Sequence, residues 1–241
     1  MVVWLEDSAS PFPPVKRALH NPNGLLAAGG ELTPQRLLTA YRQGIFPWFN
    51  PGEPILWWSP NPRCVIHPSE IHISKSLRKF IRQSDYTVTF DKAFTKVMQA
   101  CAEPRSYQQG TWISPKMIAA YTALHHQGIA HSVEVWDGEN LVGGLYGLSI
   151  GSLFFGESMF SRQTNASKIA FSFLCVQLQQ WGFNLIDCQV HNEHLESLGA
   201  KLIERDAFCA LLAKHVDDPS ISQWEFSIDV NAVAQFATGI R

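Results

Sequence analysis

Two acidic side chains stand inside otherwise apolar, strand-like segments of the chain. Glu157 lies within residues 153–161, and Asp187 lies within residues 185–190. A carboxylate in such a run loses hydration that it regains only from a partner, so fold stability gives little reason for it. Two such acids, the second close to Gln189, indicate a site that handles a proton or a cationic ligand. The alternative is that each acid ends a strand and binds backbone N–H groups.

Composition limits the classes of protein to which the chain can belong. The 241 residues are 46% hydrophobic and 17% charged, which is typical of a globular protein with a sizeable core. With a net charge of −2 the chain as a whole is not a polyanion binder, so contact with nucleic acid requires a local basic patch. Five widely spaced cysteines without a C-x-x-C motif predict reduced thiols and a cytoplasmic location. We expect neither a secretory leader nor a membrane span.

The N-terminal quarter combines one well-delimited helix with an aromatic segment. Thr33 is the expected N-cap, Pro34 the first helical residue and Gly44 the terminator. Residues 45–62 then hold five aromatic side chains and five prolines, and we expect this segment to be a rigid loop without regular structure. We place a domain boundary at its end, which gives a small N-terminal domain, 1–62, and a larger one, 63–241.

Periodicity in the larger domain predicts alternating helices and strands. We expect a helix from Ser74 to Gln83, a strand at 86–90, and a helix to about residue 102 capped by Asp91. The further expected helices are 114–128, 165–181, 192–198 and one from residue 206, and the further expected strands are 131–136, 141–149, 152–160, 184–190 and 201–204. Hairpins followed by a β-α-β crossover predict an α+β fold whose mixed sheet is flanked by helices.

Five segments together carry a resemblance to a known family. They are Asn23–Leu26, Gly44–Phe49, Gly110–Ile113, Phe154–Ser161 and Asp187–Gln189. In this order they resemble the leucyl/phenylalanyl-tRNA–protein transferases, from about residue 20 to 212. The resemblance implies a C-terminal domain of the acetyltransferase (GNAT) type. It also implies an aminoacyltransferase that moves Leu or Phe from aminoacyl-tRNA to proteins with N-terminal Arg or Lys, forming the degradation signal of the N-end rule.

The sequence differs from those of acetyltransferases in the segment that would bind the acyl donor. Members that use acyl-CoA have Arg/Gln-x-x-Gly-x-Gly/Ala between a strand and a helix, where backbone N–H groups bind pyrophosphate. The corresponding stretch here is 162–167, in which Asn165 and Ser167 stand where glycines would allow close approach. The sequence therefore favours an RNA ester over CoA and predicts no cofactor.

The reaction that the resemblance implies assigns roles to the two embedded acids. An aminoacyl ester is already activated, so no covalent nucleophile is needed, but the attacking α-amine, with a pKa of about 8, must be neutral. A well-placed general base contributes roughly 10² to 10⁴ in rate. We expect Asp187 to be this base and to face an open cleft, with Gln189 orienting the amine or the ester. The resemblance implies that Glu157 binds the cationic side chain of the acceptor.

Other residues are assigned to the aminoacyl-tRNA through the same resemblance. Trp48 and Trp112 match positions that hold the terminal adenosine, with Tyr41 and Tyr121 nearby, although a tryptophan is more often part of a core. The six residues expected in the pocket for the aminoacyl side chain are Leu145, Phe154, Met159, Phe171, Leu174 and Ile186. Strand alternation turns Ile186 away from Asp187, so its role rests on the resemblance alone. Such a pocket separates Leu and Phe from Met only partly, so some Met transfer is expected.

Four basic side chains on the helix at 74–83 are expected to contact acceptor-stem phosphates. They lie on one side of the helix and are Lys75, Arg78, Lys79 and Arg82. The alternative to phosphate contact is that this side of the helix is simply exposed to solvent. His191 and His194 have the spacing of metal ligands but no further ligand at a suitable distance in sequence, so no metal is predicted. Two other functions stay open, an acyl-CoA-dependent N-acetyltransferase and a non-enzymatic RNA-binding module.

Overall fold

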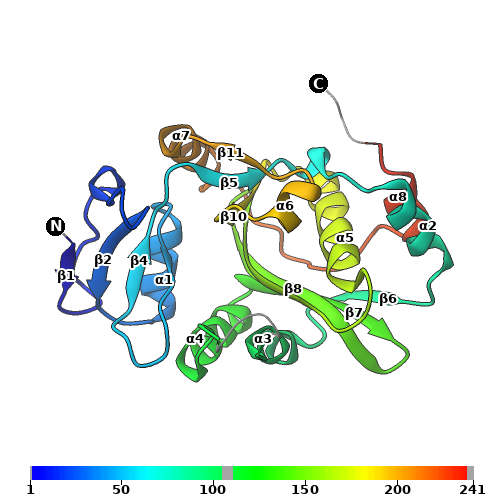
Figure 1. Ribbon diagram of the computed structural model, residues 1–241, viewed down its shortest axis with the longest axis horizontal. Helices are drawn as coiled ribbons and strands as arrows, with labels where there is room; N and C mark the ends of the chain where they lie inside the picture. Colours follow the sequence, from blue (N-terminus) through cyan, green and yellow to red (C-terminus); the bar gives the residue numbers. More distant parts are fainter. Residues whose placement is uncertain (1, 105–110, 238–241) are drawn as a thin grey trace.

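The computed structural model describes residues 2–104 and 111–237, in which the strands form two sheets (Figure 1). The smaller sheet has the order β1-β2-β4-β3, and its first two strands are parallel while the others are antiparallel. Its elements are β1 (Val3–Leu5), β2 (Leu25–Gly29), β3 (Phe46–Pro47) and β4 (Leu56–Trp58), with a 3-10 helix at Val15–Arg17 and α1 (Pro34–Tyr41).

The segment 45–62 is not the irregular loop that the sequence predicted, because β3 and β4 lie within it. Pro47 ends β3, which is the edge strand of the small sheet, and its missing N–H costs no ladder bond there. Trp57 is fully buried, and its indole Nε1 donates to the carbonyl of Gly29 at 2.9 Å. The prolines of this segment lie at the end of β3 and on either side of β4, so they limit the length of these strands without preventing them.

The larger sheet has seven strands in the order β11-β5-β10-β9-β8-β7-β6. Among the described strands of this sheet, only β9 and β10 pair in parallel, so the predicted mixed sheet is confirmed. The strands are β5 (Arg63–Ile66), β6 (Thr87–Phe90), β7 (Ala130–Asp137), β8 (Asn140–Ile150), β9 (Leu153–Ser161), β10 (Leu185–Gln189) and β11 (Lys201–Ile203). β10 joins the sheet between β9 and β5, so the strands of Glu157 and Asp187 are neighbours.

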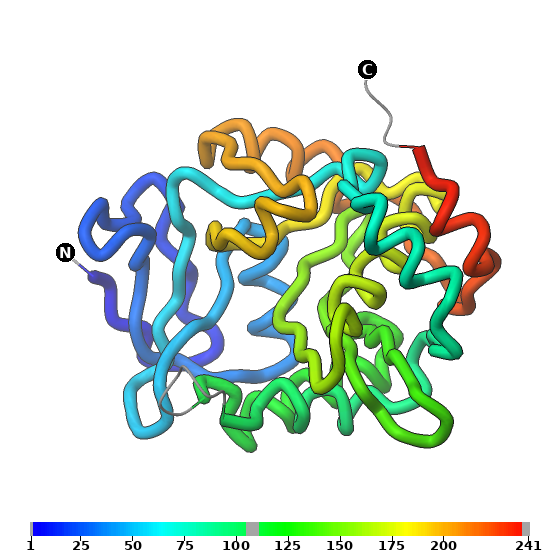
Figure 2. Tube along the Cα trace, turned by 45° about the vertical axis from the view of Figure 1, so that its right-hand side comes forward, coloured from blue at the N-terminus to red at the C-terminus, as the bar shows by residue number. Residues whose placement is uncertain are grey.

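Helices cover both faces of this sheet (Figures 1 and 2). α5 (Ala166–Gln180) packs on one face against β7, β8 and β9. α3 (Phe94–Ala102) and α4 (Pro115–His126) cover the other face, and α4 also contacts α1. α2 (Lys75–Gln83) packs with α8 (Val230–Gln235) at the end of the molecule remote from the small sheet, and η2 (Pro68–Glu70) precedes α2.

The predicted helix starts at Thr33, Ser74 and Ser114 are confirmed, because each side chain accepts a backbone N–H three residues later. The predicted cap Asp91 is wrong. Its carboxylate binds Nδ1 of His131 and accepts the N–H of Ser132, and α3 begins only at Phe94. The buried carboxylate of Glu134, from the neighbouring strand, instead accepts the N–H groups of Lys92 and Ala93.

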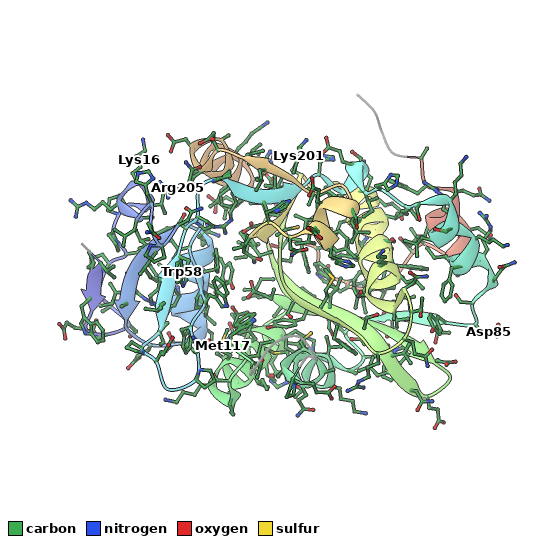
Figure 3. The ribbon with its side chains drawn as sticks, in the orientation of Figure 1. Lys16, Trp58, Asp85, Met117, Lys201 and Arg205 are labelled. Atoms are coloured by element: carbon green, nitrogen blue, oxygen red, sulfur yellow. The ribbon has the colours of Figure 1, made fainter. Side chains whose placement is uncertain are left out.

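The junction between the two sheets is packed. α6 (Glu193–Ser197) and α7 (Arg205–His215) follow β10 and β11, and Figure 3 shows Arg205 beside the upper end of the small sheet. Its Nη1 donates to the carbonyl of Ser59 at 2.7 Å. One hydrophobic cluster includes residues of both sheets, among them Trp57 and Phe155. The division at residue 62 falls between β4 and β5 and stays a prediction.

Candidate functional site

A cavity of about 1000 Å³ runs along the ends of β9 and β10 and reaches β3 of the small sheet. Glu157 and Gln189 line it together with Trp48 and Trp112. Residues from segments more than 100 positions apart therefore meet at one place, as the sequence predicted for these four. The cavity is large enough for an aminoacyl group and an adenosine.

Part of the cavity wall is apolar. Five of the six residues predicted for the aminoacyl side chain line it, and all belong to the hydrophobic cluster under α5 or pack against it: Leu145, Phe154, Met159, Phe171 and Leu174. Ile186 is wrong as a lining residue, because it is fully buried in the same cluster and does not reach the cavity. Strand alternation predicts that the side chain of Ile186 points away from that of Asp187. The structure agrees with this prediction and not with the lining role that the resemblance implied.

The carboxylate of Glu157 forms the polar centre of the cavity wall. Its Oε1 accepts the hydroxyl of Tyr41 at 2.7 Å and Nε2 of Gln189 at 3.1 Å, and its Oε2 accepts the hydroxyl of Tyr121 at 3.0 Å. The two tyrosine hydroxyls are 2.5 Å apart. Burial raises the pKa of Glu157 to about 7, although the two tyrosine hydrogen bonds act in the opposite direction. A carboxyl group with this pKa exchanges a proton near neutral pH.

Tyr41 and Tyr121, which were expected near the terminal adenosine, offer it no exposed surface. Both are fully buried, so neither ring offers a face to a base. They project from α1 and α4, and their hydroxyl groups donate hydrogen bonds to the carboxylate of Glu157. Trp48 and Trp112 remain as the aromatic candidates. Trp48 is 43% exposed, its ring lies 5.8 Å from that of Trp58, and Trp112 is partly exposed.

Asp187 does not face an open cleft, and that expectation is wrong. The residue is 1% exposed, and its two oxygens accept Nε and Nη2 of Arg63 at 2.8 and 2.6 Å. Its Oδ1 also accepts the N–H of Gln189 at 3.0 Å. The ladder between β10 and β5 shifts between Asp187 and Gln189, and Gln189 has a φ of 55°, so the two side chains do not share a face through simple alternation.

Arg63, which sequence reasoning missed, connects the parts of the molecule around Asp187. It is fully buried, its Nη1 donates to the carbonyl of Gly44 at 3.1 Å, and its guanidinium lies between the rings of Phe46 and Phe208. These groups belong to the small sheet region, to β10 and to α7. A charged residue in an apolar strand was the signal that selected Glu157 and Asp187, and it applies equally to Arg63.

The four basic residues of α2 are not at the cavity. α2 lies at the end of the molecule remote from the small sheet (Figure 1). Arg78 is engaged in packing, because its Nε and Nη1 donate to the carbonyls of Ile73 and Ala234. Lys75, Lys79 and Arg82 are exposed. No residue of α2 lines the cavity, so this helix is separate from it.

Among residues 2–104 and 111–237, no group of three or more His, Cys, Asp and Glu side chains has the arrangement of a metal site. In the same ranges no helix is both long and apolar enough to cross a membrane. Gly110, part of one segment that carried the resemblance, lies outside the described residues.

Solved structures overlap this fold only loosely. A GCN5-related N-acetyltransferase from Kribbella flavida is 11% identical, with a TM-score of 0.36, and the match covers 68% of this chain and 58% of that one. The L-PGS from Bacillus licheniformis is 10% identical, with a TM-score of 0.39, over 69% of this chain and 53% of that one. At such scores the overlaps support no inference about activity.

Sequence relatives match over nearly the whole chain. The leucyl/phenylalanyl-tRNA–protein transferases of Stutzerimonas stutzeri (strain A1501) and Pseudomonas fluorescens (strain SBW25) are each 59% identical over 93% of this chain and 99% of their own length. That of Cellvibrio japonicus (strain Ueda107) is 61% identical over 91% of this chain and 93% of its own. The leucyl/phenylalanyl-tRNA protein transferase family matches residues 65–213, and its N-terminal domain matches residues 30–61. The chain therefore belongs to the leucyl/phenylalanyl-tRNA protein transferase family.

Proposed function

We propose that this protein transfers Leu or Phe, and less readily Met, from aminoacyl-tRNA to the α-amino group of proteins that begin with Arg or Lys. The transfer forms a peptide bond and creates an N-end rule degradation signal. The observation that carries this proposal is the cavity, whose wall combines five apolar side chains with a carboxylate and an amide. The apolar side chains suit the side chain of the donor amino acid, and the polar pair suits the reacting ester.

The polar groups in the cavity wall are sufficient for the reaction of an activated ester with an amine. The ester of an aminoacyl-tRNA needs only a positioned amine and a place for one proton, and Glu157 and Gln189 offer both at the cavity wall. The five apolar residues select the donor by shape. The stretch that would bind CoA phosphates has Asn165 in the left-handed region, with φ of 64°, so a side chain stands where acyl-CoA enzymes have glycine.

A donor comparison tests the proposed function. The protein is mixed with a peptide that begins with Lys, in the presence of either charged tRNA or acetyl-CoA, and the peptide mass is measured. We expect a gain of one Leu, Phe or Met residue with tRNA and no gain with acetyl-CoA. A gain of one acetyl group would support the N-acetyltransferase, and tRNA binding without any product would support the RNA-binding module.

We propose that Trp48 and Trp112 hold the terminal adenosine. Stacking on an aromatic face contributes about 1–3 kcal/mol for each base, so Trp48→Ala and Trp112→Ala should each weaken binding of a non-hydrolysable aminoacyl-adenosine by roughly 5- to 150-fold. Isothermal calorimetry measures this directly. Trp4→Ala is the matched control, because Trp4 is 58% exposed on the outer strand of the small sheet. Unchanged affinity in both cavity variants would contradict the stacking role.

We propose that Lys75, Lys79 and Arg82 of α2 contact tRNA phosphates. Replacing all three by Gln should weaken tRNA binding and lower the slope of log affinity against log salt by up to about three, one for each lost phosphate contact. Binding of the short aminoacyl-adenosine should stay unchanged. Arg78 is left in place because its guanidinium holds the carbonyls of Ile73 and Ala234. An unchanged salt slope would show that this face is merely solvated.

A further inference from the structure

Three oxygen-bearing side chains form a closed ring beneath the cavity wall. Tyr41 comes from α1, Tyr121 from α4 and Glu157 from β9. The hydroxyls of Tyr41 and Tyr121 are 2.5 Å apart, and each is 2.7 or 3.0 Å from one oxygen of Glu157. Three different elements thus bring their polar atoms together at one carboxyl group that also lines the cavity.

The ring has one more contact than it has hydroxyl protons. Each tyrosine hydroxyl donates one hydrogen, whereas the ring contains three short O···O contacts. With Glu157 ionised, one contact therefore has no hydrogen between its two oxygens. A proton on Glu157 supplies the third hydrogen, and each contact then becomes a hydrogen bond. The ring can therefore hold one further proton at this carboxyl group without losing a contact.

We propose that Glu157 accepts the proton that the attacking α-amine loses and then returns it to the 3′-oxygen of the departing tRNA. The inference rests on the proposed function and assigns the proton transfer within it. The amine nitrogen forms the new bond to the carbonyl carbon, the bond from that carbon to the 3′-oxygen breaks, and one proton passes from nitrogen to Glu157 and on to the oxygen. Glu157 ends as it began, and no other reactant is needed.

Asp187 is not placed for this step. Its oxygens are taken by Arg63 and by the N–H of Gln189, and it is sealed from the cavity. Asp187 acts through Gln189, whose main chain it holds and whose Nε2 donates to Glu157 at 3.1 Å. Asp187 is therefore a positioning residue, and Glu157 is the acid of the pair that meets substrate.

The groups around Glu157 agree with exchange near neutral pH. It faces Tyr41, Tyr121, the hydroxyl of Tyr146 from β8, and the Arg63–Asp187 pair. Burial is the largest influence and raises the pKa of Glu157 to about 7, Asp187 raises it further, and Arg63 lowers it. Burial also raises the pKa values of all three tyrosines well above 10, so they stay neutral, and Tyr41 and Tyr121 keep their hydroxyl hydrogens for the ring.

The test combines Glu157→Gln with the variants Tyr41→Phe, Tyr121→Phe and the Tyr41→Phe/Tyr121→Phe pair. Single-turnover transfer from preformed Phe-tRNA to a saturating Lys-started peptide is measured from pH 5.5 to 9. We expect Glu157→Gln to lose roughly 10² to 10⁴ in rate. The tyrosine pair should shift the acidic limb of the pH–rate profile upward by about one unit, because two hydrogen bonds that favour the charged carboxylate are lost.

Controls separate this assignment from a structural role. The acceptor amine titrates equally in every reaction, so a shift between variants belongs to the enzyme. Glu139→Gln, at an exposed residue of the β7–β8 hairpin, should leave rate and profile unchanged. If Glu157→Gln does not fold, the profile of the tyrosine pair decides the matter, since phenylalanine keeps both buried rings.

Four results would contradict the proposed function or the proton assignment. Wild-type protein that transfers no residue from any charged tRNA overturns the proposed function itself. An active wild type with Glu157→Gln within tenfold of its rate overturns only the proton assignment, as does an unshifted profile in the tyrosine pair. Near-normal rates with lost preference for Arg and Lys over a neutral N-terminus would instead show that Glu157 binds the acceptor's side chain.

Discussion

Glu157→Gln is expected to be more stable than the wild-type protein above pH 7. The folded protein raises the pKa of Glu157 from 4.5 to about 7, so between these values the folded state binds more protons than the unfolded state. Stability contributed by this group is complete below pH 4.5 and is lost as pH rises through 7. The full shift corresponds to about 3 kcal/mol, an upper value because the side chain borders the cavity.

Unfolding by urea at pH 5 and pH 8 measures this effect. The wild-type free energy of unfolding should fall by about 1–3 kcal/mol more than that of Glu157→Gln over this interval. Gln keeps the shape of the side chain and hydrogen-bonding atoms for Tyr41 and Tyr121, so the difference reports the charge. Parallel pH dependences in the two proteins would contradict a raised pKa and would weaken the proton assignment. A gain in stability together with lost activity is the pattern expected where a site is maintained for function.

Arg63→Met is expected to destabilise the protein by about 3–5 kcal/mol, because it leaves the charge of Asp187 buried without a partner. Asp187→Asn should be similarly harmful, since it leaves the guanidinium of Arg63 buried without its anion. The double variant Arg63→Met/Asp187→Asn removes both charges and keeps an oxygen for the N–H of Gln189. Replacing both members of a buried ion pair is often nearly neutral, so the double variant should recover most of the loss.

Thermal and urea unfolding of the four proteins completes this cycle, and transfer activity is followed in parallel. If Asp187 positions Gln189, the double variant regains activity along with stability. Activity that stays absent in a fully folded double variant would show that the carboxylate itself is needed. Glu70→Gln is a suitable control, because its ion pair with Lys201 lies at the surface and contributes at most about 1 kcal/mol.

Local sequence signals predicted most of the helices and strands. Caps at Thr33, Ser74 and Ser114 act within four residues, so their chemistry is visible in the sequence alone. The error at 45–62 arose because proline was interpreted without knowing which strand lies at the sheet edge. The edge position of β3 follows from its pairing with β4, which pairs on its other side with β2, and neither pairing is visible in the local sequence.

The sequence selected several residues that the structure brings together, but not the contacts that they make. An acid in an apolar strand was the signal that selected both Glu157 and Asp187. Which of the two meets the cavity depends on Arg63, which is 124 residues from Asp187 in the chain. The roles of Tyr41 and Tyr121 likewise depend on how α1 and α4 meet β9, and no local pattern contains that information.

The most direct measurement is the rate of Phe transfer to a Lys-started peptide at pH 8 by two folded variants, Glu157→Gln and Arg63→Met/Asp187→Asn. The carboxylate at the cavity is the proton acceptor in this account, and the sealed one is structural. Glu157→Gln should therefore be slower than wild type by at least about 100-fold, while the double variant should stay within about tenfold. An active Glu157→Gln beside an inactive, well-folded double variant would contradict the account.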